Sequence, residues 1–423
     1  MVQSMSDSKC FRSGQPDGQW RCRYHAVSFN APLGPSKRSG QRSYRKGEAA
    51  LLTSEGCRAR QNRLLRKMEA NCWDAFITAD RRTAYYLAGF LSPPDALIIF
   101  ILWGDGRTSL ISIARSTGYA DEMEYLENYS INRSIDFPDH DAATALDRLL
   151  RKQGRHDQRS WALDEPSINV LQAEALRAVY PQAEFFDATK TLLQLRKRKD
   201  EDEIASIRVN LKYCAAAYSA AREIIQPDIT ELDVYNAMYN AIVREAGTSV
   251  EFAGDFACGE RGISGGGPPT SRKIQPGDLY ILDIFPAANL YFADTCRTFA
   301  AGEPTELQHR AWDITMQAVR LAESMVKPGV RACDVYAEIK TFLDSQEISN
   351  KSFWHHAGHG LGHRGHEAPR IIPGTDDVFE EGDVFTLEPG MYTKGLQGGI
   401  RLEDNYVLRA NGLEDLFHYP WEL

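Results

Sequence analysis

Ala221-Arg-Glu-Ile-Ile-Gln-Pro-Asp-Ile-Thr-Glu-Leu-Asp-Val-Tyr235 is matched, 101 residues further along the chain, by Ala322-Glu-Ser-Met-Val-Lys-Pro-Gly-Val-Arg-Ala-Cys-Asp-Val-Tyr336. In each stretch a helix is expected to end before the proline, and a second helix to begin near Asp-Val-Tyr. Thr230 and Asp233 resemble a capping box at that second start. Because the preceding helices and following strands also correspond, duplication is favoured over chance. Two related α+β halves would form a cleft at their shared sheet.

The region before this duplication has a different pattern. The chain of 423 residues exceeds what one compact core usually holds. Between residues 58 and 195, a helix around 61–70 and apolar strands at 74–78, 97–103, 109–113 and 160–164 predict an α/β domain. The charged link Leu195-Arg-Lys-Arg-Lys-Asp-Glu-Asp-Glu203 marks its end. The duplicated α+β domain is therefore expected to occupy residues 196–423.

Residues 1–57 are predicted to be a disordered basic extension. Residues 1–60 contain 11 Lys and Arg against 4 Asp and Glu, in a chain whose net charge is −9. A nucleic-acid-binding or targeting arm is the alternative, but the segment shows no apolar period and no signal-peptide core. We therefore expect no nucleic-acid partner.

Composition predicts a cytoplasmic protein that does not enter a membrane. The longest apolar run, Ala96 to Trp103, is too short to cross a bilayer and is typical of a buried strand. The eight cysteines are scattered and form no Cys-x-x-Cys pair. This favours reduced thiols over a disulfide scaffold or a zinc ribbon.

Two carboxylates are expected side by side on a hairpin. Gly277–Phe285 and Leu290–Phe299 have strand composition and flank the short turn Pro286-Ala-Ala-Asn289, with Asp283 and Asp294 placed almost symmetrically about it. Two close anions between apolar neighbours lose hydration and repel, so a cation is expected between them. The alternative is one surface carboxylate and one paired with Arg297.

A histidine cluster follows in Phe353-Trp-His-His-Ala-Gly-His-Gly-Leu-Gly-His-Arg-Gly-His-Glu-Ala-Pro369. Five of the ten histidines lie within residues 355–366, interleaved with glycines that let backbone approach a metal or a substrate closely. A single histidine is more often structural than a ligand, but this cluster indicates a site. Neutral imidazole suits first-row transition metals.

Two further strands supply acidic candidates. Glu388 is expected at the end of a strand, just before a Pro-Gly turn. In 399–408, period-two alternation places Ile400, Leu402, Tyr406 and Leu408 on one face and Arg401, Glu403 and Asn405 on the other, polar face. Four carboxylates are neutralised by two divalent cations better than by one. One imidazole among oxygen donors favours Mn²⁺, or Fe²⁺ and Co²⁺, over a thiolate-bound zinc.

Together these motifs resemble the pita-bread metallopeptidases, which include creatinase, Xaa-Pro aminopeptidase, prolidase and methionine aminopeptidase. The resemblance rests on Leu282-Asp283, Ala293-Asp-Thr-Cys-Arg-Thr-Phe299, Gly358-His-Gly-Leu-Gly362 with His366-Glu-Ala-Pro369, Leu387-Glu-Pro-Gly-Met391 and Arg401-Leu-Glu-Asp404. It covers about residues 60–423 and implies a pita-bread catalytic domain behind a creatinase-type N-terminal α/β domain. That N-terminal domain argues against methionine aminopeptidase.

The resemblance also implies roles for individual residues. Asp283 would bind one divalent metal, His359 and Glu388 the other, and Asp294 and Glu403 would bridge them. A bridging hydroxide would attack the scissile carbonyl, with Glu388 as general base and then acid. His366 would hydrogen-bond the substrate or the tetrahedral intermediate, and Arg401 would orient the bridging carboxylate. Mn²⁺ is the expected metal, with Co²⁺, Fe²⁺ or Zn²⁺ as alternatives.

The implied activity is that of an Xaa-Pro aminopeptidase or prolidase acting on a peptide, in a homodimer. The sequence departs from the family pattern at one position that affects the expected substrate. Relatives carry a histidine about 17 residues before the first aspartate, whereas this chain has none between 251 and 308, and Gly266 or Gly267 takes its place. His363 or His355 could substitute, or could simply hydrogen-bond within the loop. Alternatives are a non-peptide C–N hydrolase of creatinase or ectoine-hydrolase type, acting on a small amide, a lyase, or an inactive binding module.

Overall fold

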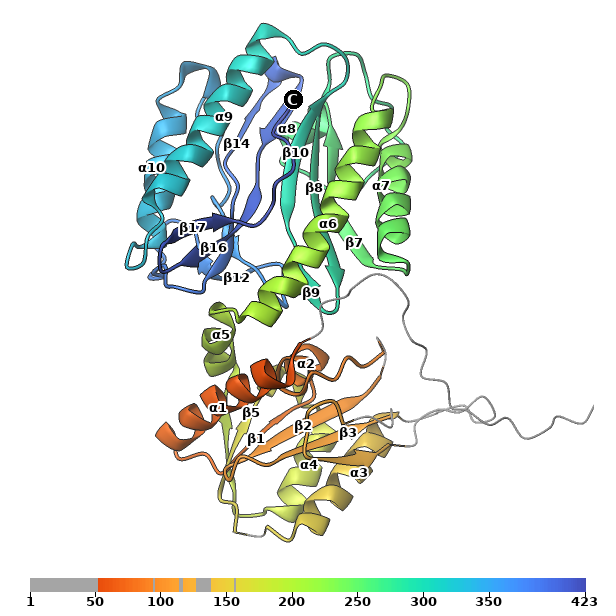
Figure 1. Ribbon diagram of the computed structural model, residues 1–423, viewed down its shortest axis with the longest axis vertical. Coiled ribbons are helices and arrows are strands. Elements are labelled where there is room, and N and C mark those ends of the chain that lie inside the picture. The colour runs from red at the N-terminus through yellow and green to blue at the C-terminus, as the bar shows by residue number, and fades with distance from the viewer. Residues whose placement is uncertain (1–51, 94–95, 114–116, 127–137, 156) are drawn as a thin grey trace, which may run out of the picture. The chain divides into compact units, whose positions relative to one another are not determined.

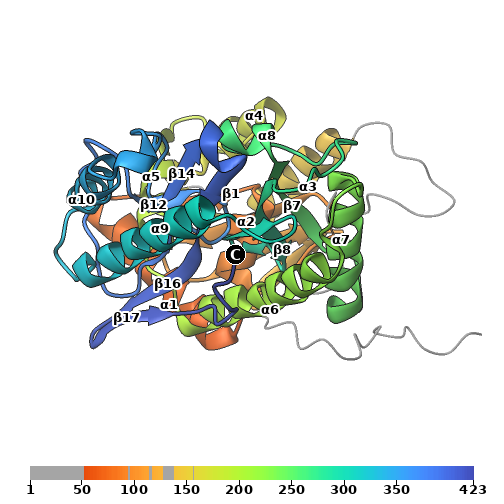
Figure 2. The ribbon, with the colours of Figure 1, turned by 90° about the horizontal axis from the view of Figure 1, so that it is seen from above.

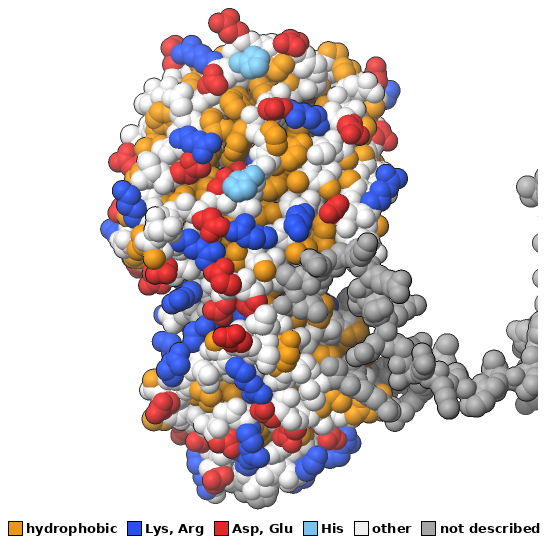
Figure 3. Space-filling model, in the orientation of Figure 1, with side chains coloured by type: hydrophobic (Ala, Val, Ile, Leu, Met, Phe, Trp, Pro, Cys, Tyr) orange, Lys and Arg blue, Asp and Glu red, His pale blue; other side chains and the backbone are white. Residues whose placement is uncertain are grey.

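A computed structural model describes residues 52–93, 96–113, 117–126, 138–155 and 157–423. The predicted basic extension lies outside the described residues except at its end, where the first helix begins at Ser54 rather than near Gln61. In the described part of the chain, no helix combines the length and apolarity that crossing a membrane requires. Acidic and basic side chains are interspersed over the face shown in Figure 3, so neither charge dominates it.

The N-terminal region is the α/β domain that the alternating pattern predicts, built on one six-stranded sheet (Figure 1). The strand order is β4-β3-β2-β1-β5-β6, with β1 Ala75–Thr78, β2 Ile98–Trp103, β3 Thr108–Ser112, β4 Glu122–Tyr125, β5 Ser160–Leu163 and β6 Glu184–Asp187. The helices are α1 Ser54–Ala70, α2 Arg81–Ala88, α3 Pro138–Gln153, α4 Val170–Val179 and α5 Thr189–Lys197. Alternate residues of the fully buried β2 enter two cores, one against α1, α2 and α5 and one against α3 and α4.

The C-terminal region consists of two α+β halves, each with a helix pair against antiparallel strands (Figures 1 and 2). The first half contains α6 Glu201–Ile224, α7 Glu231–Ala246, β7 Glu251–Cys258, α8 Glu260–Ile263, β8 Leu279–Ala288, β9 Tyr291–Phe292 and β10 Thr295–Ala300. The second contains α9 Glu306–Met325, α10 Ala332–Asp344, β11 His359–Gly360, β12 Glu367–Arg370, β13 Val384–Leu387, β14 Gly390–Thr393, β15 Gly398–Arg401, β16 Asp404–Arg409 and β17 Gly412–Asp415.

The duplicated sequence occupies equivalent places in the two halves. Helix α7 begins at Glu231 and α10 at Ala332, which preserves the offset of 101 residues. The predicted capping box is confirmed, because Thr230 accepts from the backbone N–H of Asp233 and the Asp233 side chain accepts from Thr230. The second copy begins at Arg331, whose side chain makes no capping hydrogen bond.

The predicted hairpin forms, but its turn lies further along the chain. Strand β8 runs through Pro286 to Ala288, and Asn289 and Leu290 form the turn with φ values of 53° and 62°. Positive φ at both positions is what a two-residue type I′ turn requires. The prediction of a turn at residues 286–289 was therefore wrong by about three residues.

The single strand expected over residues 399–408 is two strands in different sheets. β15 pairs with β14, whereas β16 pairs with β13 and β17. The break falls at Glu403, whose backbone N–H and C=O pair instead with Cys296 at 3.1 and 3.2 Å. Because Glu403 pairs with Cys296 of β10, the side chains do not alternate between a buried and an exposed face here. All four residues from Ile400 to Glu403 are buried.

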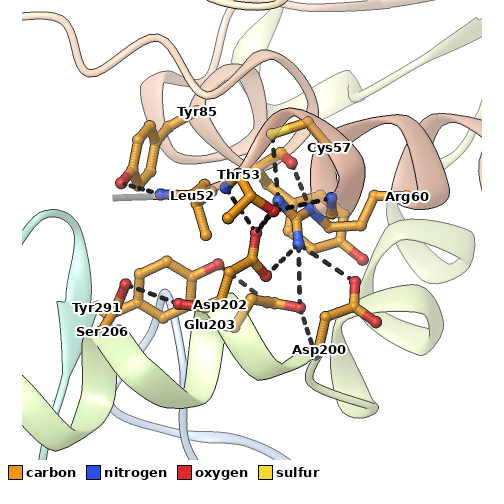
Figure 4. A network of polar contacts seen from close by, with 12 residues as sticks. Leu52, Thr53, Cys57, Arg60, Tyr85, Asp200, Asp202, Glu203, Ser206 and Tyr291 are labelled. Carbon is orange, nitrogen blue, oxygen red and sulfur yellow. Dashed lines mark hydrogen bonds and ion pairs between the residues drawn. The ribbon is translucent and has the colours of Figure 1, made fainter. Parts of the chain in front are cut away.

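A buried arginine joins α1 to the start of α6 (Figure 4). Arg60, fully buried, donates from Nη1 to Asp202 at 2.8 Å and lies 3.2 Å from Asp200 and 3.7 Å from Glu203. The pKa of Glu203 is raised to about 7, mainly by burial. Tyr291, in β9 of the C-terminal region, donates its hydroxyl to Glu203 at 2.9 Å. Arg60 thus supplies the buried positive charge nearest Asp202 and Glu203 at this acidic helix start, while Arg63 also pairs with Asp200 at 2.7 Å.

We expect Arg60→Met to lower the free energy of unfolding by about 3–5 kcal/mol, because it leaves buried carboxylates without their cation. Arg58→Met is the matched control, since Arg58 pairs with Asp121 at 2.6 Å but both side chains are about two-fifths exposed. Such a pair contributes about 0–1 kcal/mol. Urea denaturation of both variants measures the difference, and equal small losses would contradict the role given to Arg60.

Candidate metal centre

All five predicted ligands line one cavity of about 570 Å³ in the C-terminal region. Each comes from a different place in the two halves. Asp283 lies within β8, Asp294 directly before β10, His359 at the start of β11, Glu388 directly after β13 and Glu403 between β15 and β16. The cavity is also lined by Asp255, Ser264, Gly265, Gly266, Gly267, Phe285, Trp354, His355, His356, His366 and Arg401.

The ligand atoms fall into two overlapping groups. Asp294, His359 and Glu403 form one group and Asp283, Glu388 and Glu403 the other, with the atoms of each group within 4.8 Å of one another. His359 Nε2 lies 3.3 Å from Glu388 Oε1 and 3.6 Å from Asp294 Oδ2. Glu403 belongs to both groups, which is the placement expected of a bridging carboxylate.

The four carboxylates are strongly desolvated, each at most 6% exposed. Burial raises the pKa of Asp283 to about 6 and raises the pKa values of Asp294 and Glu403 well above their usual range. Among the described residues, Asp283 Oδ1 and both carboxylate oxygens of Glu403 have no hydrogen-bond partner. Buried acceptors without donors are costly unless a cation satisfies them, so the donor set fits divalent metal ions.

His359 is oriented for a metal by its backbone surroundings. Its Nδ1 lies 3.1 Å from the carbonyl oxygen of Gly360, and its backbone N–H donates to Thr386 Oγ1 at 3.2 Å. An Nδ1–H that donates to this carbonyl leaves Nε2 as the free acceptor, and Nε2 is the atom that faces the carboxylates.

Arg401 enters the cavity from β15 and contacts the predicted ligand Asp283. Its Nη1 donates to Asp283 Oδ2, its Nε donates to the Tyr392 hydroxyl at 2.9 Å, and its Nη2 donates to the carbonyl of Gly265. The structure shows this contact with Asp283, and the orientation of a bridging carboxylate by Arg401 stays a prediction from the resemblance. Glu403 leaves the line of β15 to pair with Cys296, so the nearest carboxylate is that of Asp283.

The alternative pairing with Arg297 does not occur. Arg297 is buried beneath the site, where Nη2 lies 2.8 Å from Asp404 Oδ1 and Nη1 donates to the backbone carbonyl of Glu403 at 2.9 Å. It therefore supports Glu403 through the backbone and leaves the predicted carboxylate ligands unpaired with it.

The histidine cluster divides between the cavity and the domain core. The ring of His366 stacks on that of His359 with centroids 3.8 Å apart, and His355 Nε2 lies 2.7 Å from the Tyr392 hydroxyl in the cavity wall. His363 lies elsewhere, because its Nδ1 contacts the carbonyl of Leu290 at 2.9 Å and its ring packs on Tyr291. Of the two proposed substitutes for the missing histidine, only His355 reaches the cavity.

Two titratable residues of the cavity were not singled out from the sequence. His356 Nδ1 lies 3.0 Å from Glu388 Oε1, and although burial opposes it, this carboxylate raises the pKa of His356. In turn, His356 and His359 outweigh the effect of burial and hold the pKa of Glu388 below its usual range. Asp255 is the other, directly opposite Asp283 on β7. An acidic residue in the middle of a mostly apolar strand was the available signal for it.

Comparison with known proteins covers both regions. The family model described as metallopeptidase family M24 matches residues 205–410, and that of the creatinase/prolidase N-terminal domain matches residues 60–198. A putative dipeptidase, YkvY, of Bacillus subtilis is 26% identical over 84% of this chain and 96% of its own length. An Xaa-Pro dipeptidase of Lactobacillus delbrueckii subsp. lactis is 25% identical over 84% of this chain and 96% of its own.

Solved structures share the fold. An Xaa-Pro dipeptidase from Bacillus anthracis superposes with a TM-score of 0.74 at 22% identity, covering 87% of this chain and 99% of its own. A prolidase from Pyrococcus horikoshii gives 0.70 at 23% identity, covering 86% and 99%. With its two family domains in this order and a cavity built from the family's motifs, the chain belongs to the pita-bread metallopeptidases of family M24 and is a peptidase.

Proposed function

We propose that this metallopeptidase is an exopeptidase of the Xaa-Pro dipeptidase or aminopeptidase type, with two divalent cations held by Asp283, Asp294, His359, Glu388 and Glu403. The observation that supports it most directly is the buried group of four carboxylates and one imidazole, three of whose oxygens have no partner among the described residues. The curated relative named as an Xaa-Pro dipeptidase supports the substrate class.

The ligand set favours a metal that accepts mostly oxygen donors. Four carboxylates with one imidazole suit Mn²⁺, and Co²⁺, Fe²⁺ or Zn²⁺ remain alternatives. Divalent cations, when bound, lower the pKa of water and polarise the scissile carbonyl. Homodimer formation and a cytoplasmic location stay predictions from the sequence and its resemblance.

Proton transfer falls to Glu388. Its pKa is lowered by His356 and His359 against the effect of burial, so Oε1 is ionised at neutral pH and can accept a proton from the attacking water. The same oxygen can then deliver that proton to the leaving nitrogen. His366, exposed at the cavity wall, is placed to donate a hydrogen bond to the carbonyl oxygen as charge develops on it.

A substrate panel tests the activity. Protein reconstituted with Mn²⁺ should release the first residue from Xaa-Pro dipeptides and Xaa-Pro-Yaa tripeptides, and not from Xaa-Ala controls, as followed by amino-acid analysis. Metal-loaded protein that leaves every peptide intact would favour a small C–N compound as substrate, an alternative supported by the glycines at 265–267 where relatives carry a histidine.

Asp294→Asn tests the ligand set. It removes one anion of the bridging pair, so we expect loss of bound Mn²⁺ and a fall in kcat/KM on the order of 100-fold or more. Asp278→Asn is the control, because Asp278 is a buried carboxylate just before β8 that pairs with Arg272 at 2.6 Å outside the cavity. Wild-type metal content in the Asp294 variant, measured by elemental analysis, would contradict its role as a ligand.

His366→Ala should lower kcat by about 10²- to 10³-fold while both cations stay bound, because it removes a donor to the developing oxyanion rather than a ligand. The exposed His309 on α9 provides the control His309→Ala, which should change neither quantity. Loss of Mn²⁺ from the His366 variant would make His366 a ligand instead.

A further inference from the structure

Asp255 is a carboxylate of the cavity that belongs to neither ligand group. On the antiparallel pair β7–β8 its Cα lies opposite that of Asp283, and directly opposed residues project to the same face of a sheet. Asp255 is therefore held beside a ligand by the strand register itself. Its side chain is one-third exposed, towards the cavity.

Arg401 lies between the two carboxylates. Its Nη1 contacts Asp283 Oδ2 and is 3.2 Å from Asp255 Oδ2. The other oxygen of Asp255 accepts from the backbone N–H of Gly267 at 2.8 Å. Since Arg401 also donates to the carbonyl of Gly265, the carboxylate, the guanidinium and the glycine loop form a closed ring of hydrogen bonds.

The loop fits this carboxylate only because it lacks side chains. A Cβ at Gly266 would come within 2.2 Å of the Asp255 carboxylate, and Gly265 and Gly267 have φ values of +100° and +128°. Backbone at these φ values strongly favours glycine. The loop is therefore shaped around Asp255, and Arg401 is fixed against both.

The charges give this arrangement a consequence for metal binding. An arginine that pairs with Asp283 alone would compete with a cation for that carboxylate and would repel the cation. Asp255 contacts the same Nη1 as Asp283 and adds a second negative charge there, so the guanidinium is neutralised without drawing on Asp283 alone, and Asp283 can bind a metal. Asp278 also pairs with an arginine, Arg272, but this pair does not line the cavity and contacts none of the proposed ligands, so Asp278 is a suitable control.

We propose that Asp255 is a positioning residue of the metal centre, which holds Arg401 and the loop 265–267 and keeps the guanidinium from competing with a divalent cation for Asp283. The inference rests on the proposed metal site, but not on the identity of the peptide substrate.

Titration of metal-free protein with Mn²⁺, followed by calorimetry, tests this role. Asp255→Asn removes the charge while keeping the size of the side chain, and should weaken Mn²⁺ binding about 10- to 100-fold. Asp278→Asn should bind Mn²⁺ as the wild type does. The thermal unfolding of each metal-free variant separates an effect on the site from an effect on the fold, and Asp255→Ser serves if the amide variant fails to fold.

A double-mutant cycle distinguishes action through Arg401 from direct action. In an Arg401→Met background, Asp255→Asn should change Mn²⁺ affinity much less than it does alone, because the Arg401 guanidinium that competes with Mn²⁺ for Asp283 is already absent. Additive effects, or wild-type affinity in Asp255→Asn, would overturn the proposal. A wild-type protein that binds no Mn²⁺ would overturn this and the metal site together, whereas one that binds Mn²⁺ but cleaves no Xaa-Pro peptide would overturn the proposed activity alone.

Discussion

The desolvation of four carboxylates in one cavity is the constraint on which the rest of the catalytic region depends. Transfer of each ionised group out of water costs several kcal/mol, and the groups also repel one another. Burial accordingly raises the pKa values of Asp283, Asp294 and Glu403. The surrounding sheets must hold these side chains together against that cost, and the divalent cations that we propose here would offset it.

The scaffold meets this constraint by fixing the backbone of the proposed ligands, while Asp283 Oδ1 and both carboxylate oxygens of Glu403 keep no partner among the described residues. Asn405 accepts from the N–H of Asp294 at 3.2 Å and donates to the carbonyl of the same residue. The backbone of Glu403 pairs with Cys296, and Arg297 donates to its carbonyl. The hydrogen bonds with Cys296 and Arg297 are all made to the backbone of Glu403. Its two carboxylate oxygens have no hydrogen-bond partner among the described residues. The backbone of Glu403 is thus held in place while its carboxylate oxygens stay available to a metal ion.

What the sequence could predict follows from local physics. The capping box at Thr230, the buried strand at 98–103 and the hairpin that carries Asp283 are set by residues close together in the chain. Register over long separations is not, since a single sequence does not reveal that Asp255 lies opposite Asp283 or that Cys296 pairs with Glu403. For that reason the single strand predicted at 399–408 was wrong, and the contacts of Arg401 with Asp255 and of His356 with Glu388 were not foreseen.

The histidine segment shows how one loop can serve both the centre and the joint between domains. His359 faces the carboxylates, whereas His363, four residues later, packs on Tyr291 with ring centroids 4.1 Å apart and on Tyr86 at 5.8 Å. Tyr291 in turn donates to Glu203 beside Arg60. A chain of direct contacts therefore runs from the N-terminal domain to His363, four residues after the predicted ligand His359. Because burial keeps the pKa of His363 far below its usual range, this imidazole is neutral. It can therefore pack among aromatic rings without the free-energy cost of burying a positive charge. The uncharged His363 packs on the side of the loop away from the cavity, whereas the imidazole of His359 faces the carboxylates of Asp294 and Glu388.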